Sequence, residues 1–159
     1  MKSLENLNMV GELEISLDYG KGKGREAIFK KKNLITKASK QFLLSGIYLP
    51  GIVSDQVTTL KVGTGGSVDP AGLYPKSEDP TQTGLITLLT SVPVVYTLDV
   101  ASIAVTFLAD MDQSMANGSL LTECGLFKAS GAIFNIKNHP GIQKTSDFSV
   151  HYSWVIRYL

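Results

Sequence analysis

Apolar and polar residues alternate with a period of two in several stretches of the chain, the first of them near the N-terminus. Leu13, Ile15 and Leu17 alternate with acidic and hydroxyl residues. Because successive side chains of a strand point to opposite faces, this pattern predicts a half-buried β-strand over about 11–18. A Gly-Lys-rich turn and a second extended stretch follow, so the first 32 residues are predicted to hold a β-hairpin.

The same period recurs through the rest of the chain. Strands are predicted at 57–62, 94–100 and 103–107, and on both sides of a glycine turn at 129–131. Near the C-terminus, large apolar residues share one face that is expected to point into the core: Phe148, Val150, Tyr152, Trp154 and Ile156.

Four segments between these strands give other signals. Segment 85–89 fits either a helical turn or extended chain. The polar stretches 109–118 and 137–141 are predicted to be connecting loops. Loops as long as the Gly-, Pro- and Thr-rich stretch 63–84 are uncommon in compact domains and are usually binding loops or mobile segments, and both interpretations stay open for this stretch.

One helix is predicted. Ile35, Ala38 and Phe42 recur at helical spacing, and the stretch is bounded by a candidate N-cap, Thr36, and by Gly46. This pattern indicates a short amphipathic α-helix over about 36–45.

About seven or eight strands, short turns and one helix favour a mainly β fold, an antiparallel β-sandwich. We expect a single domain over residues 1–159, with the hairpin within 1–32 as a candidate assembly arm.

Composition narrows the classes of function. The net charge of +1 gives no general electrostatic reason to expect nucleic acid or a membrane surface. Cys124 is the single cysteine, which excludes an intrachain disulfide, and we expect it to be a small buried apolar residue. There is no signal-peptide pattern and no apolar run of membrane-spanning length. We therefore expect synthesis in a cytoplasm.

Lys21, Lys23 and Arg25 begin the one basic cluster, which continues over 30–32. The cluster could bind phosphate or an acidic partner, or it could be a solvated hairpin tip and edge. We favour the second interpretation, because Lys discourages unwanted strand pairing. The Gly-Lys run lacks the spacing of a phosphate-binding loop, and no aromatic residues are interleaved with it.

Few residues point to catalysis. His139, expected in a loop, and His151, on the polar face of the last strand, have no zinc-binding spacing. No nucleophile-elbow motif is present. Two acidic pairs are interpreted as solvated loop residues rather than a general acid and base: Asp110 with Asp112, and Glu78 with Asp79. The sequence therefore predicts no enzyme activity, no cofactor and no metal.

An ordered set of short motifs remains. A strand end, Val-Gly-Thr-Gly-Gly at 62–66, is followed by Thr-Gly-Leu at 83–85 and by Glu-Cys-Gly-Leu-Phe at 123–127, with Gly131 and Ile-Phe at 133–134 after it. This order resembles the virion-attachment domain at the N-terminus of tail-fibre proteins from tailed bacteriophages. It also resembles small neck, tail and baseplate proteins of such phages.

The resemblance covers roughly residues 33–159 and has departures. The loop after Gly66 is long, Cys124 replaces a β-branched or leucine-like residue, and no fibre shaft follows Leu159. The resemblance therefore implies an adaptor or fibre-less structural protein of the virion, made in the host cytoplasm. Such a protein would form a homo-oligomer or ring and dock other virion proteins such as fibres, without nucleic acid or membrane as partner.

Candidate interaction residues follow from these motifs and from the hairpin: Gly63, Gly65, Gly66, Asp79, Glu123, Gly125, Leu126, Phe127, Lys21, Lys23 and Arg25. Among them, Glu123 is expected to be a buried polar anchor that accepts backbone N–H bonds in a loop.

Three alternatives stay open. A head-decoration (cement) protein would also be small and β-rich. A carbohydrate-binding module would need exposed aromatic residues, which Tyr48, Tyr74 and Tyr96 could supply. An enzyme ranks below both, because no catalytic constellation supports it.

Overall fold

The computed structural model describes residues 9–35, 55–99 and 101–158. These residues form nine strands and no helix. The strands are β1 (Met9–Asp18), β2 (Arg25–Ile35), β3 (Val57–Gly63), β4 (Leu88–Pro93), β5 (Val95–Asp99), β6 (Ala104–Met111), β7 (Leu120–Lys128), β8 (Ile133–Gln143) and β9 (Ser149–Tyr158). The predicted mainly β, antiparallel fold is confirmed. The predicted helix over about 36–45 lies outside the described residues.

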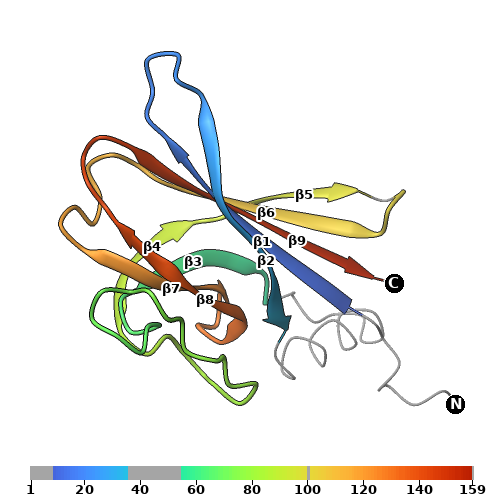
Figure 1. The fold of residues 1–159 in the computed structure, drawn as a ribbon. Coiled ribbons are helices and arrows are strands. Elements are labelled where there is room, and N and C mark those ends of the chain that lie inside the picture. The colour runs from blue at the N-terminus through green and yellow to red at the C-terminus, as the bar shows by residue number, and fades with distance from the viewer. Residues whose placement is uncertain (1–8, 36–54, 100, 159) are drawn as a thin grey trace, which may run out of the picture.

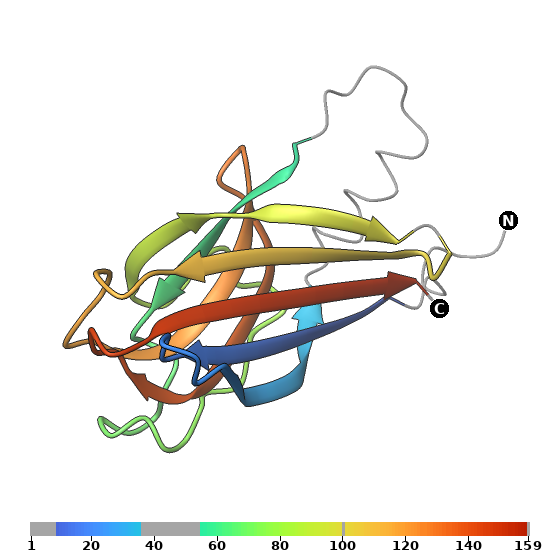
Figure 2. The same ribbon diagram turned by 90° about the horizontal axis from the view of Figure 1, so that it is seen from above.

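The strands form two antiparallel sheets that are joined at both margins. Their hydrogen-bonded order is β4-β3-β7-β8-β2-β1-β9-β6-β5. Strand β2 belongs to both sheets, because its first part pairs with β1 and its last residues, Leu34 and Ile35, pair with β8. On the opposite margin the chain passes directly from β4 to β5 through Val94 (Figures 1 and 2). Strands that change sheets in this way hold the two layers together.

One large core fills the space between the two sheets. The predicted inward face of β9 is confirmed, because Phe148, Val150, Tyr152, Trp154 and Ile156 are all buried. Leu13, Ile15 and Leu17 of β1 are buried beside them, also as predicted. From the other sheet, Phe134 meets Phe107 of β6 edge to face, with ring centroids 6.0 Å apart. Cys124 is fully buried, as expected.

Some sequence-based boundaries were wrong. The stretch 137–141 is not a loop but the second half of β8, and Asp110 is not in a connector but in β6. There its carboxylate is hydrogen-bonded to Nδ1 of His151. The ambiguous segment 85–89 leads into strand β4.

The error in β8 has a physical cause. Strand β7 is buried along nearly its whole length, and β8 is buried over 133–136 and at the neighbouring residues Asn138 and His139, which point to opposite faces. A strand buried on both faces does not alternate between apolar and polar residues, so its period of two disappears. The outer face of these strands is covered by the loop between β3 and β4 (Figure 1).

His139 is one residue whose position was predicted wrongly for this reason. It is fully buried within β8 and does not lie in a loop. Its Nδ1 lies 2.9 Å from the carbonyl oxygen of Pro140, and its ring lies 5.9 Å from that of Phe29. Burial lowers the pKa of His139 from 6.5 to about 4, because the charged imidazolium loses its hydration there.

We predict that acid weakens the fold through His139. Between pH 6.5 and about 4 the unfolded chain takes up a proton on this residue while the folded chain resists it. Stability should therefore fall as the pH falls through this window, by roughly 3 kcal/mol in total. Urea unfolding at a series of pH values measures the slope. The variant His139→Leu should show a shallower slope, and an unchanged slope would contradict the assignment.

Candidate interaction site around Glu123

Glu123 lies in the middle of β7, paired with Gly63 of β3 on one side and Asn138 of β8 on the other. Its side chain is fully buried. One carboxylate oxygen, Oε1, accepts hydrogen bonds from the backbone N–H groups of Gly65 (2.9 Å) and Thr87 (2.7 Å). The other, Oε2, accepts one from Ile86 (2.8 Å). The expectation that Glu123 accepts backbone N–H bonds from a loop is confirmed.

These bonds close the loop between β3 and β4 at both of its ends. Gly65 follows β3 directly, whereas Ile86 and Thr87 precede β4. A hydrogen bond from the N–H of Thr64 to the carbonyl oxygen of Thr87 (3.0 Å) joins the same two ends. Hydrogen bonds to an ionised carboxylate are stronger than neutral ones. The buried charge is thus compensated by main-chain dipoles and fixes the base of the loop.

The glycines before the loop are required by close packing. A Cβ atom on Gly63 would overlap the carbonyl oxygen of Thr87, and one on Gly66 would overlap that of Thr122. On Gly65 it would lie 2.7 Å from the side chain of Ile86. The N–H of Gly66 also donates to Oγ1 of Thr122 (2.9 Å). The Gly-rich strand end therefore lies directly against β7.

The middle of the loop is fixed to β8. Lys76 donates through its backbone N–H to the carbonyl oxygen of Gly66 and through Nζ to that of Gly65, both at 2.8 Å. The carbonyl oxygen of Lys76 accepts from Nδ2 of Asn138 (3.0 Å). Oε1 of Glu78 accepts from the N–H of Asn138 (2.9 Å) and forms an ion pair with Nζ of Lys137 (2.8 Å). The loop is thus an ordered layer on the sheet.

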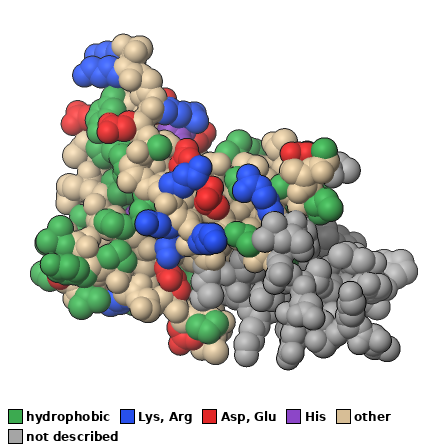
Figure 3. All heavy atoms as spheres, turned by 45° about the vertical axis from the view of Figure 1, so that its right-hand side comes forward, with side chains coloured by type: hydrophobic (Ala, Val, Ile, Leu, Met, Phe, Trp, Pro, Cys, Tyr) green, Lys and Arg blue, Asp and Glu red, His purple; other side chains and the backbone are tan. Residues whose placement is uncertain are grey.

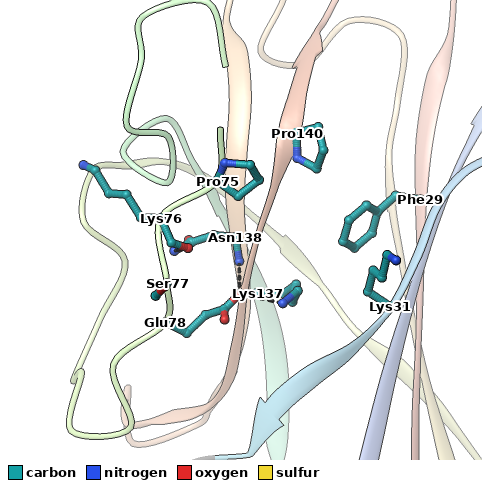
Figure 4. A pocket seen from close by; sticks show the side chains of 9 residues that line it. All are labelled: Phe29, Lys31, Pro75, Lys76, Ser77, Glu78, Lys137, Asn138 and Pro140. Carbon is teal, nitrogen blue, oxygen red and sulfur yellow. Dashed lines mark hydrogen bonds and ion pairs between the residues drawn. The ribbon is translucent and has the colours of Figure 1, made fainter. Parts of the chain in front are cut away.

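A shallow hollow of ≈ 370 Å³ lies between this layer and β2 (Figure 4). Phe29, Pro75 and Pro140 give it apolar walls, and Lys31 and Lys137 add charge. The charge of Lys137 is balanced by Glu78. No nucleophile pairs with a general base among the lining residues. In the part of the chain that the structure describes, no three acidic, His or Cys side chains gather to hold a metal ion. The lining of the hollow thus combines apolar walls with polar and charged side chains.

The structure brings some of the predicted interaction residues together. Glu123, Gly63, Gly65 and Gly66 form one cluster. Leu126 and Phe127 continue along β7 but are buried, and Gly125 packs tightly against the backbone of β8. These three can therefore shape the site from within but cannot present side chains to a partner.

The other predicted residues lie elsewhere. Asp79 is exposed in the loop and accepts hydrogen bonds from the N–H and Oγ1 of Thr81, which lower the pKa of its carboxyl. Lys21, Lys23 and Arg25 are exposed at the end of the β1–β2 hairpin. This hairpin projects away from the Glu123 cluster (Figure 1) and carries basic side chains at its tip (Figure 3). The expected solvent-exposed position of Lys21, Lys23 and Arg25 at the hairpin tip is confirmed.

Sequence reasoning missed the residues that hold the middle of the loop. Glu78 was interpreted as a solvated loop residue, but it is mostly buried in its ion pair with Lys137. No sequence pattern marked Asn138 or Thr122 as important, and none marked Lys76 as a residue that fixes the loop. The bonds from Asn138 join residues 60 and 62 positions apart, which no local pattern can report.

Comparison of the chain with protein-family models, curated proteins and solved structures found no match. No helix among the described residues has the length and apolar character needed to cross a membrane.

We predict that Glu123→Ala loosens the loop and destabilises the protein by roughly 3 kcal/mol, because three main-chain N–H groups lose a carboxylate acceptor. Amide hydrogen exchange should show lost protection at Gly65, Ile86 and Thr87, with β9 less affected. A matched control is Glu14→Ala, which removes a partly exposed glutamate from the middle of β1 and should change little. Full protection at Ile86 and Thr87 in Glu123→Ala would refute the anchor role.

A second prediction concerns the close approach of the glycines. Gly66→Ala should destabilise the fold by more than about 2 kcal/mol, since its Cβ meets main-chain atoms of β7 that cannot move independently. Gly84→Ala is the matched control: nothing lies within 4 Å of its Cβ position, so we expect a change within about 0.5 kcal/mol. Chemical denaturation measures both. Equal effects of the two substitutions would argue against the packing explanation.

Proposed function

We propose that the two sheets form a β-sandwich and that the chain is a non-enzymatic structural component of a tailed-phage virion. In this proposal it is a tail, baseplate or neck adaptor that oligomerises and docks other virion proteins such as fibres. The proposal starts from the ordered motifs that resemble phage attachment domains. It concerns a role in assembly, in which rigid surfaces matter more than reactive groups.

One observation supports the proposal above the others. The motifs that carry the resemblance are far apart in sequence, yet they meet at one carboxylate. The Gly-rich strand end at 63–66 is bonded to Glu123 of the Glu-x-Gly-Leu-Phe strand, as are Ile86 and Thr87 just after motif 83–85, whose Leu85 packs against Phe127 and Ile133. Convergence on a single structural anchor is what a shared folding motif would produce. Chance matches in unrelated segments would not have to meet.

The way the loop is built also supports an assembly role. Its base and middle are fixed by buried hydrogen bonds, while its outer residues Val68, Leu73 and Tyr74 are exposed. Asp69 holds the turn between them by accepting hydrogen bonds from the N–H groups of Leu73 and Tyr74. An ordered loop loses little conformational entropy on binding, which favours a docking surface.

The structure bears on one alternative through its tyrosines. A carbohydrate-binding module requires exposed aromatic rings near one another. Tyr74 and Tyr96 are exposed, but they lie on different elements, the β3–β4 loop and β5, and Tyr48 lies outside the described residues. A head-decoration protein remains the closer rival, since it would share the assembly chemistry.

The test is to purify virus particles released by cells that encode the chain and to quantify it by mass spectrometry against the major capsid protein. We expect a fixed stoichiometric copy number, and antibody labelling in electron microscopy should place the chain on the tail or neck. Labelling over the capsid surface would favour head decoration instead. Absence from particles would overturn the virion role. A glycan array on the purified chain tests the sugar-binding alternative.

A further inference from the structure

Strand β5 is a sheet edge without the usual protection. Among the described strands it is the last of the hydrogen-bonded order, and it pairs with β6 along one side only. All five of its residues are exposed. Its pairing with β6 is regular over the whole strand, without the register shifts that occur in four of the other pairings. Its outer edge is therefore a straight row of main-chain groups.

The side chains of this edge are mostly apolar. Val95, Tyr96 and Leu98 are 66%, 52% and 64% exposed. Proteins usually protect such edges with Lys, Pro, a bulge or an inward charge. β5 contains no Lys, Arg or Pro. Its one charge, Asp99, accepts hydrogen bonds from Ser102 in the following turn, so its carboxylate is directed away from the strand.

We propose that β5 pairs with β5 of a second copy of this chain, antiparallel and about a two-fold axis at Thr97. Such a contact would join the sheets of two copies into one continuous sheet. This proposal adds one partner and one surface to the assembly role proposed above. Only the biological purpose of the contact rests on that role.

The sequence of β5 is self-complementary in this arrangement. With Thr97 opposite Thr97, Tyr96 of each copy lies opposite Leu98 of the other. Tyr96 and Leu98 share the face of Phe107 and Val105, since directly paired residues lie on the same side of a sheet. The contact would thus extend the apolar inner face across the two-fold axis. Val95 would lie opposite Asp99, whose carboxylate is held by its own turn.

A second copy fits this edge better than an unrelated strand for two reasons. A two-fold contact uses the same patch twice, so the apolar contact between Tyr96 and Leu98 forms on both sides of the axis. The neighbouring exposed residues Leu108 of β6 and Ile103 of the β5–β6 turn extend the apolar surface around the strand. The patch is nonetheless small, so we expect an association of roughly micromolar strength.

A cysteine placed on the axis tests the register directly. Paired residues in antiparallel strands have Cα atoms about 4.5–5.5 Å apart, within the range that a disulfide spans. Thr97→Cys should therefore form a disulfide-linked dimer on mild oxidation, and the native Cys124 is buried and should not interfere. Thr81→Cys, exposed in the β3–β4 loop, is the matched control and should link far less. Equal linking of the two variants would overturn the proposed register.

Solution mass tests the surface without a covalent link. Light scattering or sedimentation from about 1 to 100 μM should show a monomer–dimer equilibrium centred in the micromolar range. Leu98→Lys should weaken dimerisation at least tenfold, whereas Leu88→Lys on β4, the opposite terminal strand, should not, although Leu88 is also exposed (55%). Circular dichroism and thermal unfolding check that both variants fold.

The outcomes separate this inference from the proposed function. A strictly monomeric wild-type chain, or an oligomer that Leu98→Lys leaves unchanged, would overturn the β5 contact. A strand from another protein would then be the remaining occupant of this edge. Neither result concerns presence in virus particles, which the particle experiment decides separately.

Discussion

The Glu123 carboxylate is the interaction on which much of this structure depends. A buried charge without partners is too costly to keep, so three main-chain N–H groups must stay where the carboxylate needs them. Because those groups come from both ends of the β3–β4 loop, the charge determines where the loop begins and ends. The loop then covers β7 and β8, and their outer faces become a second interior. One side chain thus converts a two-layer arrangement into one with a partial third layer.

This explains where the buried polar residues lie. Among the described residues, Thr122, Asn135, Asn138 and His139 are buried on β7 and β8, and buried Lys144 follows β8 directly. Thr122 and Asn138 bond to loop atoms, and Asn135 accepts from the N–H of Leu126 within the hairpin. The core between the sheets is instead apolar, built around Trp154 and its neighbours. Stability and specificity are therefore divided between an apolar interior and a polar layer under the loop.

The sequence predicts the strands around the apolar core better than the strands under the loop. Strands β1 and β9 separate core from solvent, so their alternation is clear and their inward faces were predicted correctly. Strands β7 and β8 separate core from loop, so β8 lost its alternation and His139 was misplaced. Glu123 could be recognised as an anchor, since a carboxylate in an apolar strand requires donors. Its donors could not be identified, because they lie 36 to 58 positions away.

Main-chain groups that lie outside the strand pairing are treated in opposite ways at the two ends of the β3–β5 segment. Next to β3, main-chain N–H groups that leave the sheet are bound by Glu123 and by Thr122, so that region presents few unpaired groups. At β5, the outer row of main-chain groups has no partner strand among the described residues, and the exposed side chains there are mostly apolar. A protein that needed only to stay monomeric would gain by placing a lysine or proline there. The chain places Val, Tyr and Leu there instead, which makes sense physically if that edge is meant to be covered.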